Sequence, residues 1–427
     1  MNARRQLGLR SATALVVATM IGTGVFTTSG FLLTDLKSPG AVLAAWAVAG
    51  IIATLGALSY GALARRIPES GGEYRFLSDT LHPAAGYVAG WVSLVVGFAA
   101  PAAASAFAFG KYVGGWFPEL DSRLAGGVVI LGFSALHAAH VRRGAWVQNL
   151  GVAVNLVLIL GFIALALPRL HGTSGPPLEV LPPAGMASTF AVSLIVISYS
   201  YAGWNAAVYI GGEIRHPERN LPRSLLWGTL LVTVLYFALN AVFVFSAPIP
   251  ALAGRVEVGR IAAEHLGGPA WGNAVTALVA LVLMMSVSSL VMAGPRICSQ
   301  MASDGWLPHW LAPQEGPPRH AIVAQGILSL IMLATTTFEG LLTYVGLTLS
   351  LMTGATVAGL MVLRRREGAA LSVPGWPWVP GLFLAAVVGS CGVTLVQRPA
   401  AALASLATLA LGWGAWRLSR ARGKTPA

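Results

Sequence analysis

Long apolar blocks separated by short polar loops run along the chain, in place of the alternation of an amphipathic fold. A helix that crosses a lipid bilayer needs roughly 20 apolar residues. By that rule the predicted spans are 10–34, 40–64, 84–113, 124–140, 145–168, 186–213, 223–247, 270–300, 320–337, 340–363, 377–396 and 400–418. A short amphipathic segment near 253–266 precedes the eighth span. The pattern predicts an all-α polytopic membrane protein of about twelve transmembrane helices.

Composition supports a lipid environment. Hydrophobic residues make up 56% of the 427 residues, charged residues make up 10%, and the mean hydropathy is +0.73. A soluble protein of this length needs more charge to cover its surface. The first apolar block continues to Leu33 without a polar cleavage region, so we expect a retained span and not a signal peptide.

The basic residues that give the chain its net charge of +12 lie in the loops between the apolar blocks. They form no basic face, so the charge does not favour nucleic acid binding. If the N-terminus is cytoplasmic, about three-quarters of the 27 Lys and Arg residues fall on the cytoplasmic side. This asymmetry predicts a multi-pass protein of the cell (inner) membrane with both termini in the cytoplasm. No Asp, Glu, Lys or Arg is expected at mid-membrane depth, which disfavours a charged-ring channel and a charge-relay pump.

The cysteines and histidines indicate neither an enzyme nor a metal site. Cys298 and Cys391 lie in different apolar blocks and are predicted to be buried thiols. His137 and His140 are one helical turn apart near the inner end of the fourth span, where an interfacial position without metal is expected. No serine, cysteine or aspartate arrangement suggests a protease or transferase, and no cofactor is expected.

A glycine-containing motif interrupts the first predicted span. Two glycines around a β-branched polar residue weaken a helix. If the helix breaks there, the amides that begin its second half suit a carboxylate, and the carbonyls that end its first half suit an ammonium group. Glycines in membrane helices also permit close packing, which is the alternative interpretation. The candidate substrate-binding residues in this motif are Met20, Ile21, Gly22, Thr23, Gly24 and Val25.

A polar and aromatic motif interrupts the sixth predicted span. Its candidate substrate-binding residues are Tyr199, Ser200, Ala202, Gly203, Trp204 and Asn205. Alone it could be an aromatic packing cluster. The two interruptions, however, each begin a block of five spans, and interrupted helices at matching positions of two halves point to a transporter site.

Four stretches resemble one known family. They are IGTGVF at 21–26, SGGEYRFL at 70–77 with AGW at 89–91, SYAGWNAAVYIGGEIRHPERNLPRSL at 200–225, and ASDGWLP at 302–308. In order and spacing they resemble the amino acid–polyamine–organocation superfamily, and within it the L-type amino acid transporters and bacterial amino acid permeases.

The resemblance implies one transmembrane transporter domain, 1–427, with a LeuT-like fold. Its two inverted five-helix repeats would span about 10–168 and 186–363, followed by extra helices at about 377–418. It also implies that amides near Thr23 and Gly24 bind the substrate carboxylate. Carbonyls near Met20 and Ile21, and those of Tyr199 and Ala202, would bind the α-amino group. Tyr199 would be the aromatic gate that covers the substrate from outside.

A departure from the family bears on what drives transport. Many sodium-independent relatives carry a lysine in span 5 where this chain has Asn155. Asn155, Ser288 and Ser289 are therefore a candidate cation site for Na⁺, although they could instead hydrogen-bond helix to helix. Without a lysine, proton coupling has no obvious carrier, which favours exchange or facilitated transport.

The loop after span 6 is a candidate inner gate. Glu213 and Arg215 could form an ion network with Arg219 and Arg223, or the segment could be a solvated loop. The residues of the loop after span 2 that could join the network are Arg65, Arg66 and Glu73.

The leading prediction is a secondary transporter that moves neutral L-amino acids by alternating access. A Na⁺- or H⁺-coupled symporter of another small amine or acid is the alternative within transport, and a non-transporting membrane sensor or subunit is the alternative of another class. Residues 111–123 contain no cysteine, so no disulfide-linked heavy chain is expected. The expected partners are the amino acid substrate and membrane lipid, not nucleic acid.

Overall fold

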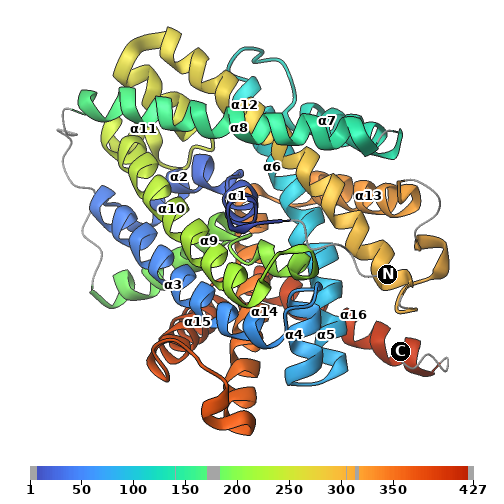
Figure 1. Ribbon diagram of the computed structural model, residues 1–427. Coiled ribbons are helices and arrows are strands. Elements are labelled where there is room, and N and C mark those ends of the chain that lie inside the picture. The colour runs from blue at the N-terminus through green and yellow to red at the C-terminus, as the bar shows by residue number, and fades with distance from the viewer. Residues whose placement is uncertain (1–6, 140, 171–182, 304, 313–316, 422–427) are drawn as a thin grey trace.

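The computed structural model describes residues 7–139, 141–170, 183–303, 305–312 and 317–421, and the ordered elements in these ranges are helices (Figure 1). The helices of the first half are α1 Leu9–Met20, α2 Gly24–Leu36, α3 Pro39–Arg66, α4 Glu73–Thr80, α5 Pro83–Val92, α6 Ala100–Val113, α7 Ser122–Ala139 and α8 Val141–Ala166. A π-helix, η1 (Ser93–Ala99), joins α5 to α6, and a 3₁₀ turn, η2 (Leu167–Arg169), follows α8.

The second half continues with longer helices. They are α9 Pro183–Tyr201, α10 Pro217–Ser246, α11 Ile249–Leu252, α12 Val258–Ser303, α13 Arg319–Thr335, α14 Phe338–Glu367, α15 Trp378–Gln397 and α16 Pro399–Ala421. The 3₁₀ segments are η3 Ala206–Glu213, η4 His309–Leu311 and η5 Gly368–Ala370.

The helices have the length and composition of membrane spans. Within the described residues, nine are long and apolar enough to cross a bilayer, or ten if α1 and α2 are counted as one span bent by 43°. Two shorter apolar helices, Val154–Arg169 and Arg319–Thr335, lie where the fifth and ninth spans are predicted. The chain is a polytopic all-α membrane protein, as the hydropathy pattern predicts.

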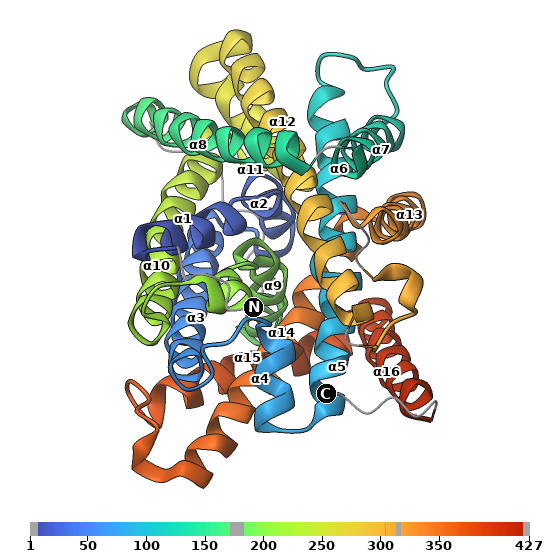
Figure 2. The same ribbon diagram turned by 45° about the vertical axis from the view of Figure 1, so that its right-hand side comes forward.

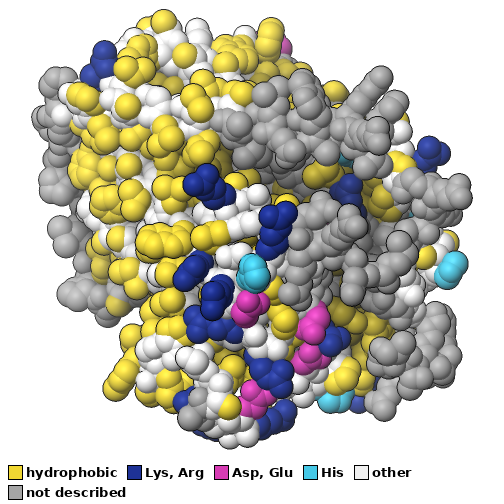
Figure 3. Space-filling model, in the orientation of Figure 1, with side chains coloured by type: hydrophobic (Ala, Val, Ile, Leu, Met, Phe, Trp, Pro, Cys, Tyr) yellow, Lys and Arg dark blue, Asp and Glu magenta, His cyan; other side chains and the backbone are white. Residues whose placement is uncertain are grey.

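The outer surface is suited to lipid. Many large apolar side chains are exposed on the bundle, among them Val396, Trp378 and Leu124. Figure 3 shows apolar side chains over much of one face, with basic and acidic side chains gathered toward its lower part. A soluble protein rarely exposes so much contiguous apolar surface, whereas the bilayer core requires it.

Ion pairs define two ends of the bundle. At one end Arg398 lies 3.3 Å from Asp35 and 3.0 Å from Glu339, which joins the end of α2 to the start of α14. At the opposite end of α14, Glu367 lies 2.9 Å from Arg66 at the end of α3. We refer to these as the Arg398 end and the Glu367 end.

The interrupted helices lie inside the bundle. In Figure 2, α2 and α9 lie in the middle, with α3 and α10 on one side and α6 and α12 on the other. Helix α9 packs against α2, α3, α14 and α15, while α1 packs along α10. The interrupted segments are therefore enclosed by protein, where non-helical backbone at membrane depth is tolerated.

A short helical segment precedes the eighth span, as the pattern near 253–266 predicts. Helix α12 begins at Val258, and non-helical backbone at Gly267 and Gly268 separates its first part from the long span. The span predicted at 223–247 begins earlier, because α10 starts at Pro217 and continues through Pro222. A proline at the first helical position loses no helical hydrogen bond. The loop after the second span contains the short helix α4, which was not predicted.

Candidate functional site

The first span breaks between Met20 and Gly24. Helix α1 ends at Met20, Ile21 is extended (φ −69°, ψ 102°), and α2 starts at Gly24. The Tyr236 hydroxyl from α10 donates to the Met20 carbonyl and interacts with the Gly22 amide. This side chain spans the break and satisfies one backbone group on each side of it, which the sequence did not indicate.

The break in the sixth span follows α9. The Ala202 amide donates to the Tyr199 carbonyl at 3.1 Å, and the chain then passes through Gly203 into η3. Gly203 has φ +100°, a conformation that favours glycine. A Cβ there would also lie 2.9 Å from the Thr19 carbonyl oxygen of α1, so the two breaks constrain each other.

The two breaks are in direct contact. A Cβ on Gly24 would lie 2.7 Å from the Ser200 Cα, so the start of α2 packs closely on α9. The Thr28 and Ser200 hydroxyls lie 3.1 Å apart. Tyr199 hydrogen-bonds with the Thr23 side chain. These contacts join the two interrupted helices to each other, although Thr28 and Ser200 are 172 residues apart in the chain.

A chain of hydroxyls leads away from the first break. Thr23 hydrogen-bonds Ser105 of α6, and the Ser105 oxygen lies 3.1 Å from that of Ser286 on α12. Serines in otherwise apolar helices gave no distinctive local signal, so the sequence missed this chain. It ties the third and eighth spans to the broken first span.

The other candidates of the second motif face the Glu367 end. The buried Trp204 ring packs edge-on against Tyr60 of α3, with centroids 4.6 Å apart. The Asn205 side chain is half-buried and donates to a Glu73 carboxylate oxygen at 2.9 Å. Val25 is buried beside the first break, whereas Ile21 and Gly22 are half-buried.

Glu73 occupies a position that the sequence did not predict. It was expected in an ion network on a loop, but its side chain is only 3% exposed and accepts a 2.7 Å hydrogen bond from Tyr60. Burial raises the pKa of this carboxyl to about 6, although hydrogen bonds from Tyr60, Asn205 and Tyr209 oppose the shift.

Backbone hydrogen bonds hold the segment that contains the candidate gate residues Glu213 and Arg215. The Leu7 amide donates to the Glu213 carbonyl at 3.0 Å, and the Arg215 amide donates to the Leu7 carbonyl at 2.8 Å. The segment before α1 is thereby held to the segment after η3. Arg66, predicted as a member of this network, instead pairs with Glu367.

The candidate cation residues have separate surroundings. The Ser288 hydroxyl lies 2.9 Å from Nε2 of His137, and the Ser289 hydroxyl donates to the Met285 carbonyl. Asn155 is buried, and its Oδ1 has no hydrogen-bond partner among the described residues. His137 lies in the last turn of α7 and is 4% exposed, since it packs against Ser288 of α12. No cluster of three metal-ligating side chains occurs among the described residues.

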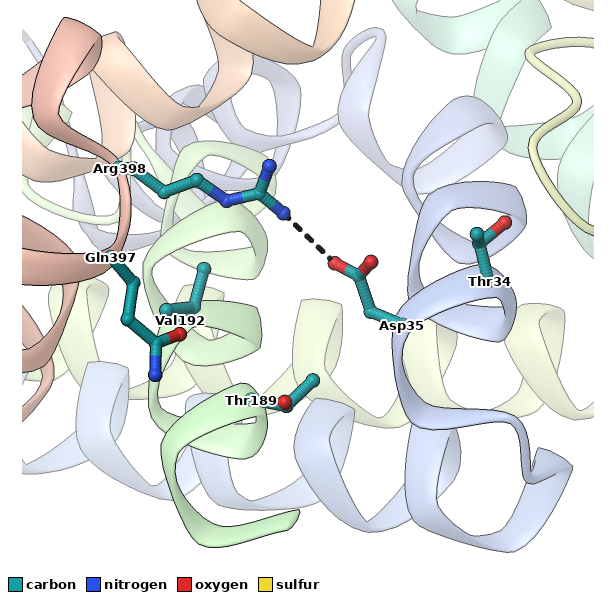
Figure 4. Close-up of a pocket in the computed structure, with 6 residues that line it drawn as sticks. All are labelled: Thr34, Asp35, Thr189, Val192, Gln397 and Arg398. Carbon is teal, nitrogen blue, oxygen red and sulfur yellow. Dashed lines mark hydrogen bonds and ion pairs between the residues drawn. The ribbon is translucent and has the colours of Figure 1, made fainter. Parts of the chain in front are cut away.

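A polar pocket lies at the Arg398 end (Figure 4). Its volume is about 400 Å³, and its lining residues are Thr34, Asp35, Thr189, Val192, Gln397 and Arg398. Figure 4 shows Arg398 reaching across to Asp35, with Val192 and Thr189 of α9 below this ion pair. Neither break lines this pocket, so it is an outer feature of the bundle and separate from the candidate substrate site.

Interrupted helices that meet inside an all-helical membrane bundle are typical of secondary transporters. A model of the amino acid permease family matches residues 7–414, and the chain belongs to this family. It is similar to b(0,+)-type amino acid transporter 1 of Mus musculus, with 29% identity over 373 residues that cover 84% of this chain and 76% of that protein. It is also similar to large neutral amino acids transporter small subunit 2 of Homo sapiens, with 29% identity over 382 residues, 85% of this chain and 70% of that protein.

Proposed function

We propose that the protein transports neutral L-amino acids by alternating access, with the substrate held by backbone atoms at the two breaks. The observation that carries this proposal is the direct contact between the breaks, where Gly24 packs on Ser200 and Tyr199 bonds to Thr23. Family membership and the relatives' names, both amino acid transporters, support the substrate class. The protein would act as a carrier and not as an enzyme.

Backbone recognition explains the choice of substrate. The first amides of α2 have no carbonyl partner within that helix, and its dipole favours a carboxylate there. Carbonyls at the ends of α1 and α9 would accept the ammonium group. No Asp, Glu, Lys or Arg lies within the described breaks at 20–25 and 199–205, so a neutral side chain suits the site.

Alternating access requires a closure at each end. The Leu7 bridge closes the Glu367 end. At the Arg398 end, Phe338 stacks on Phe107 with centroids 5.6 Å apart, and it also contacts Phe31. In this proposal the Glu367 end faces the cytoplasm, in accord with the excess of basic loops expected there. The two blocks that begin with α1 and α9 would be the inverted repeats.

We assign exchange or facilitated transport as the mode. Ser288 is engaged with His137 and Ser289 with a backbone carbonyl, which leaves Asn155 as the single candidate whose side-chain oxygen lacks a partner among described residues. One amide oxygen is too few ligands for Na⁺. The name of the second relative includes "small subunit"; for this chain we propose that no heavy chain is disulfide-linked, since Cys298 and Cys391 are buried.

Uptake into proteoliposomes tests the proposal. Purified protein should take up radiolabelled neutral amino acids saturably, faster when unlabelled amino acid is trapped inside, and equally well when choline replaces Na⁺. Absence of saturable uptake for every amino acid would refute transport and favour the sensor alternative. Uptake that collapses in choline would instead support the Na⁺-coupled alternative.

A further inference from the structure

Two segments pack closely against each other at the Glu367 end, and we refer to this contact as the joint. Residues 68–73, which lead into α4, pack against residues 205–212, which follow the break in the sixth span. The Gly212 amide donates to the Ser70 hydroxyl at 3.0 Å. A Cβ on Gly211 would lie 2.7 Å from the Pro68 carbonyl, and one on Gly72 would lie 2.6 Å from the Tyr209 ring. The two segments are therefore in close contact along their length.

Glu73 lies at one end of this joint, next to the candidate substrate site. Its Oε1 accepts hydrogen bonds from Tyr60 at 2.7 Å and Asn205 at 2.9 Å, and Tyr209 is a third donor. Asn205 directly follows the break, so this one carboxyl connects α4, α3 and the unwound part of the sixth span. Figures 1 and 2 both place α4 beside the end of α3.

Charged groups near the joint do not offset the charge of Glu73. Among the described residues no Lys or Arg lies within ion-pair distance of it. The titratable groups that face it are the phenols of Tyr60 and Tyr209. On α4 itself, Arg75 pairs with Asp79. On α14, which packs against α4, Arg366 donates to the Thr80 carbonyl, Glu367 pairs with Arg66, and Arg364 lies over the Trp376 ring. On α5, Tyr87 donates to the Trp306 carbonyl.

We propose that Glu73 is a proton-binding site of the transport cycle, which binds a proton more tightly while the joint is closed than when the joint separates and exposes the carboxyl to water. This inference rests on the proposed function, because the joint separates only if the Glu367 end opens. The sequence offered no proton carrier within the spans. The structure supplies one in a loop, because folding buries the loop carboxyl beneath the broken helix.

Thermodynamic linkage gives the direction in which pH shifts the equilibrium between the closed and the separated joint. In the closed joint the pKa of Glu73 is about 6, above the ordinary value of 4.5 that a hydrated carboxyl would regain. The closed state therefore binds the proton more tightly, and acid favours closure. Between pH 7 and pH 5 these values shift the closed-to-open ratio by roughly eightfold.

Glu73→Gln tests the site because glutamine mimics the protonated acid and keeps an oxygen for Tyr60 and Asn205. Glu69→Gln is the matched control, since Glu69 is an exposed carboxylate four residues away on the same loop. Apparent Tm of the purified proteins is measured without substrate from pH 5 to pH 7.5. Wild type and Glu69→Gln should lose stability relative to Glu73→Gln as the pH rises through about 6. Equal pH profiles for all three proteins would overturn the proposal.

Amino acid exchange in proteoliposomes supplies the second readout. Wild-type and Glu69→Gln rates should fall several-fold from pH 7 to pH 5, whereas the Glu73→Gln rate should change little. If Glu73→Gln retains the wild-type pH dependence of exchange, Glu73 is not a proton site of the cycle. If wild type moves no amino acid at all, the proposed function fails, and the Tm series still decides whether Glu73 binds the proton.

Discussion

At the residue scale, Tyr236 shows how one side chain can stabilise a broken helix. Its hydroxyl donates to the Met20 carbonyl and interacts with the Gly22 amide, so it shapes the backbone that is proposed to hold the substrate. Its ring is fully buried between Trp46 and Tyr201, with centroids at 5.6 and 5.3 Å. The aromatic cluster places the hydroxyl, and the hydroxyl positions the break.

Tyr236→Phe should weaken substrate binding roughly tenfold, because loss of one buried hydrogen bond costs about 1–3 kcal/mol and here frees the backbone at the site. Thermal stabilisation by a series of neutral amino acid concentrations measures the change in Kd. Tyr344→Phe is the control, since its hydroxyl bonds Thr408 between α14 and α16, away from both breaks. Equal Kd values for the two variants would show that Tyr236 does not position the site.

At the element scale, the glycines of the first motif have different roles. A Cβ on Gly24 would meet the Ser200 Cα of α9, whereas one on Gly22 would have ordinary contacts, the nearest being the Ser286 hydroxyl at 3.5 Å. Gly24 thus permits the close approach of two helices, as the packing interpretation of the motif holds. The same approach brings the start of α2 to the second break, so packing and the proposed binding site depend on one residue.

Gly24→Ala should lower the apparent Tm and abolish uptake, because the backbones of α2 and α9 must separate to admit a methyl group. Gly22→Ala should leave the Tm within a few degrees of wild type. Thermal unfolding in detergent together with proteoliposome uptake distinguishes the two variants. A Gly24→Ala protein with normal stability and uptake would contradict the close contact between the broken helices.

At the scale of the whole molecule, contacts between distant segments close both ends. Arg398, in the turn between α15 and α16, joins Asp35 to Glu339, and so connects the first, tenth and last spans. These side chains are partly exposed, and such ion pairs contribute up to about 1 kcal/mol each. Ion pairs of that strength can hold this end closed and still permit the opening that the proposed transport cycle requires.

Arg398→Gln should therefore favour opening of the Arg398 end. The readout is the rate at which a membrane-impermeant maleimide labels Val192→Cys, a buried position on the wall of the outer pocket. Labelling should rise roughly threefold, in line with the modest strength of partly exposed ion pairs. Native Cys298 and Cys391 are buried and give little background. Arg123→Gln, also at this end, should leave the labelling rate unchanged; if Arg398→Gln does the same, Arg398 does not hold the closure.

The sequence by itself determined the membrane architecture and the location of both breaks. Lipid demands apolar blocks of a fixed length, and glycine weakens a helix wherever it occurs, so both signals are local and can be recognised without a structure. The break at Met20–Gly24 and the one after Tyr201 lie within the predicted motifs. The start of the span at α10 was less predictable, because a proline is accepted at the first helical position, and the helix begins at Pro217 instead of near 223.

Only the tertiary structure decided what the polar residues do. The sequence marked Glu73 as a loop carboxylate, but it did not indicate the hydrogen bonds from Tyr60 and Asn205. It likewise gave neither the contact between His137 and Ser288 nor any role for Tyr236. Each of these contacts joins segments that are separate in the chain, up to 216 residues apart for Tyr236 and Met20. The burial of a polar side chain and its hydrogen-bond partners are decided when helices pack together. A local sequence pattern can therefore identify a polar residue but not the residue to which it bonds.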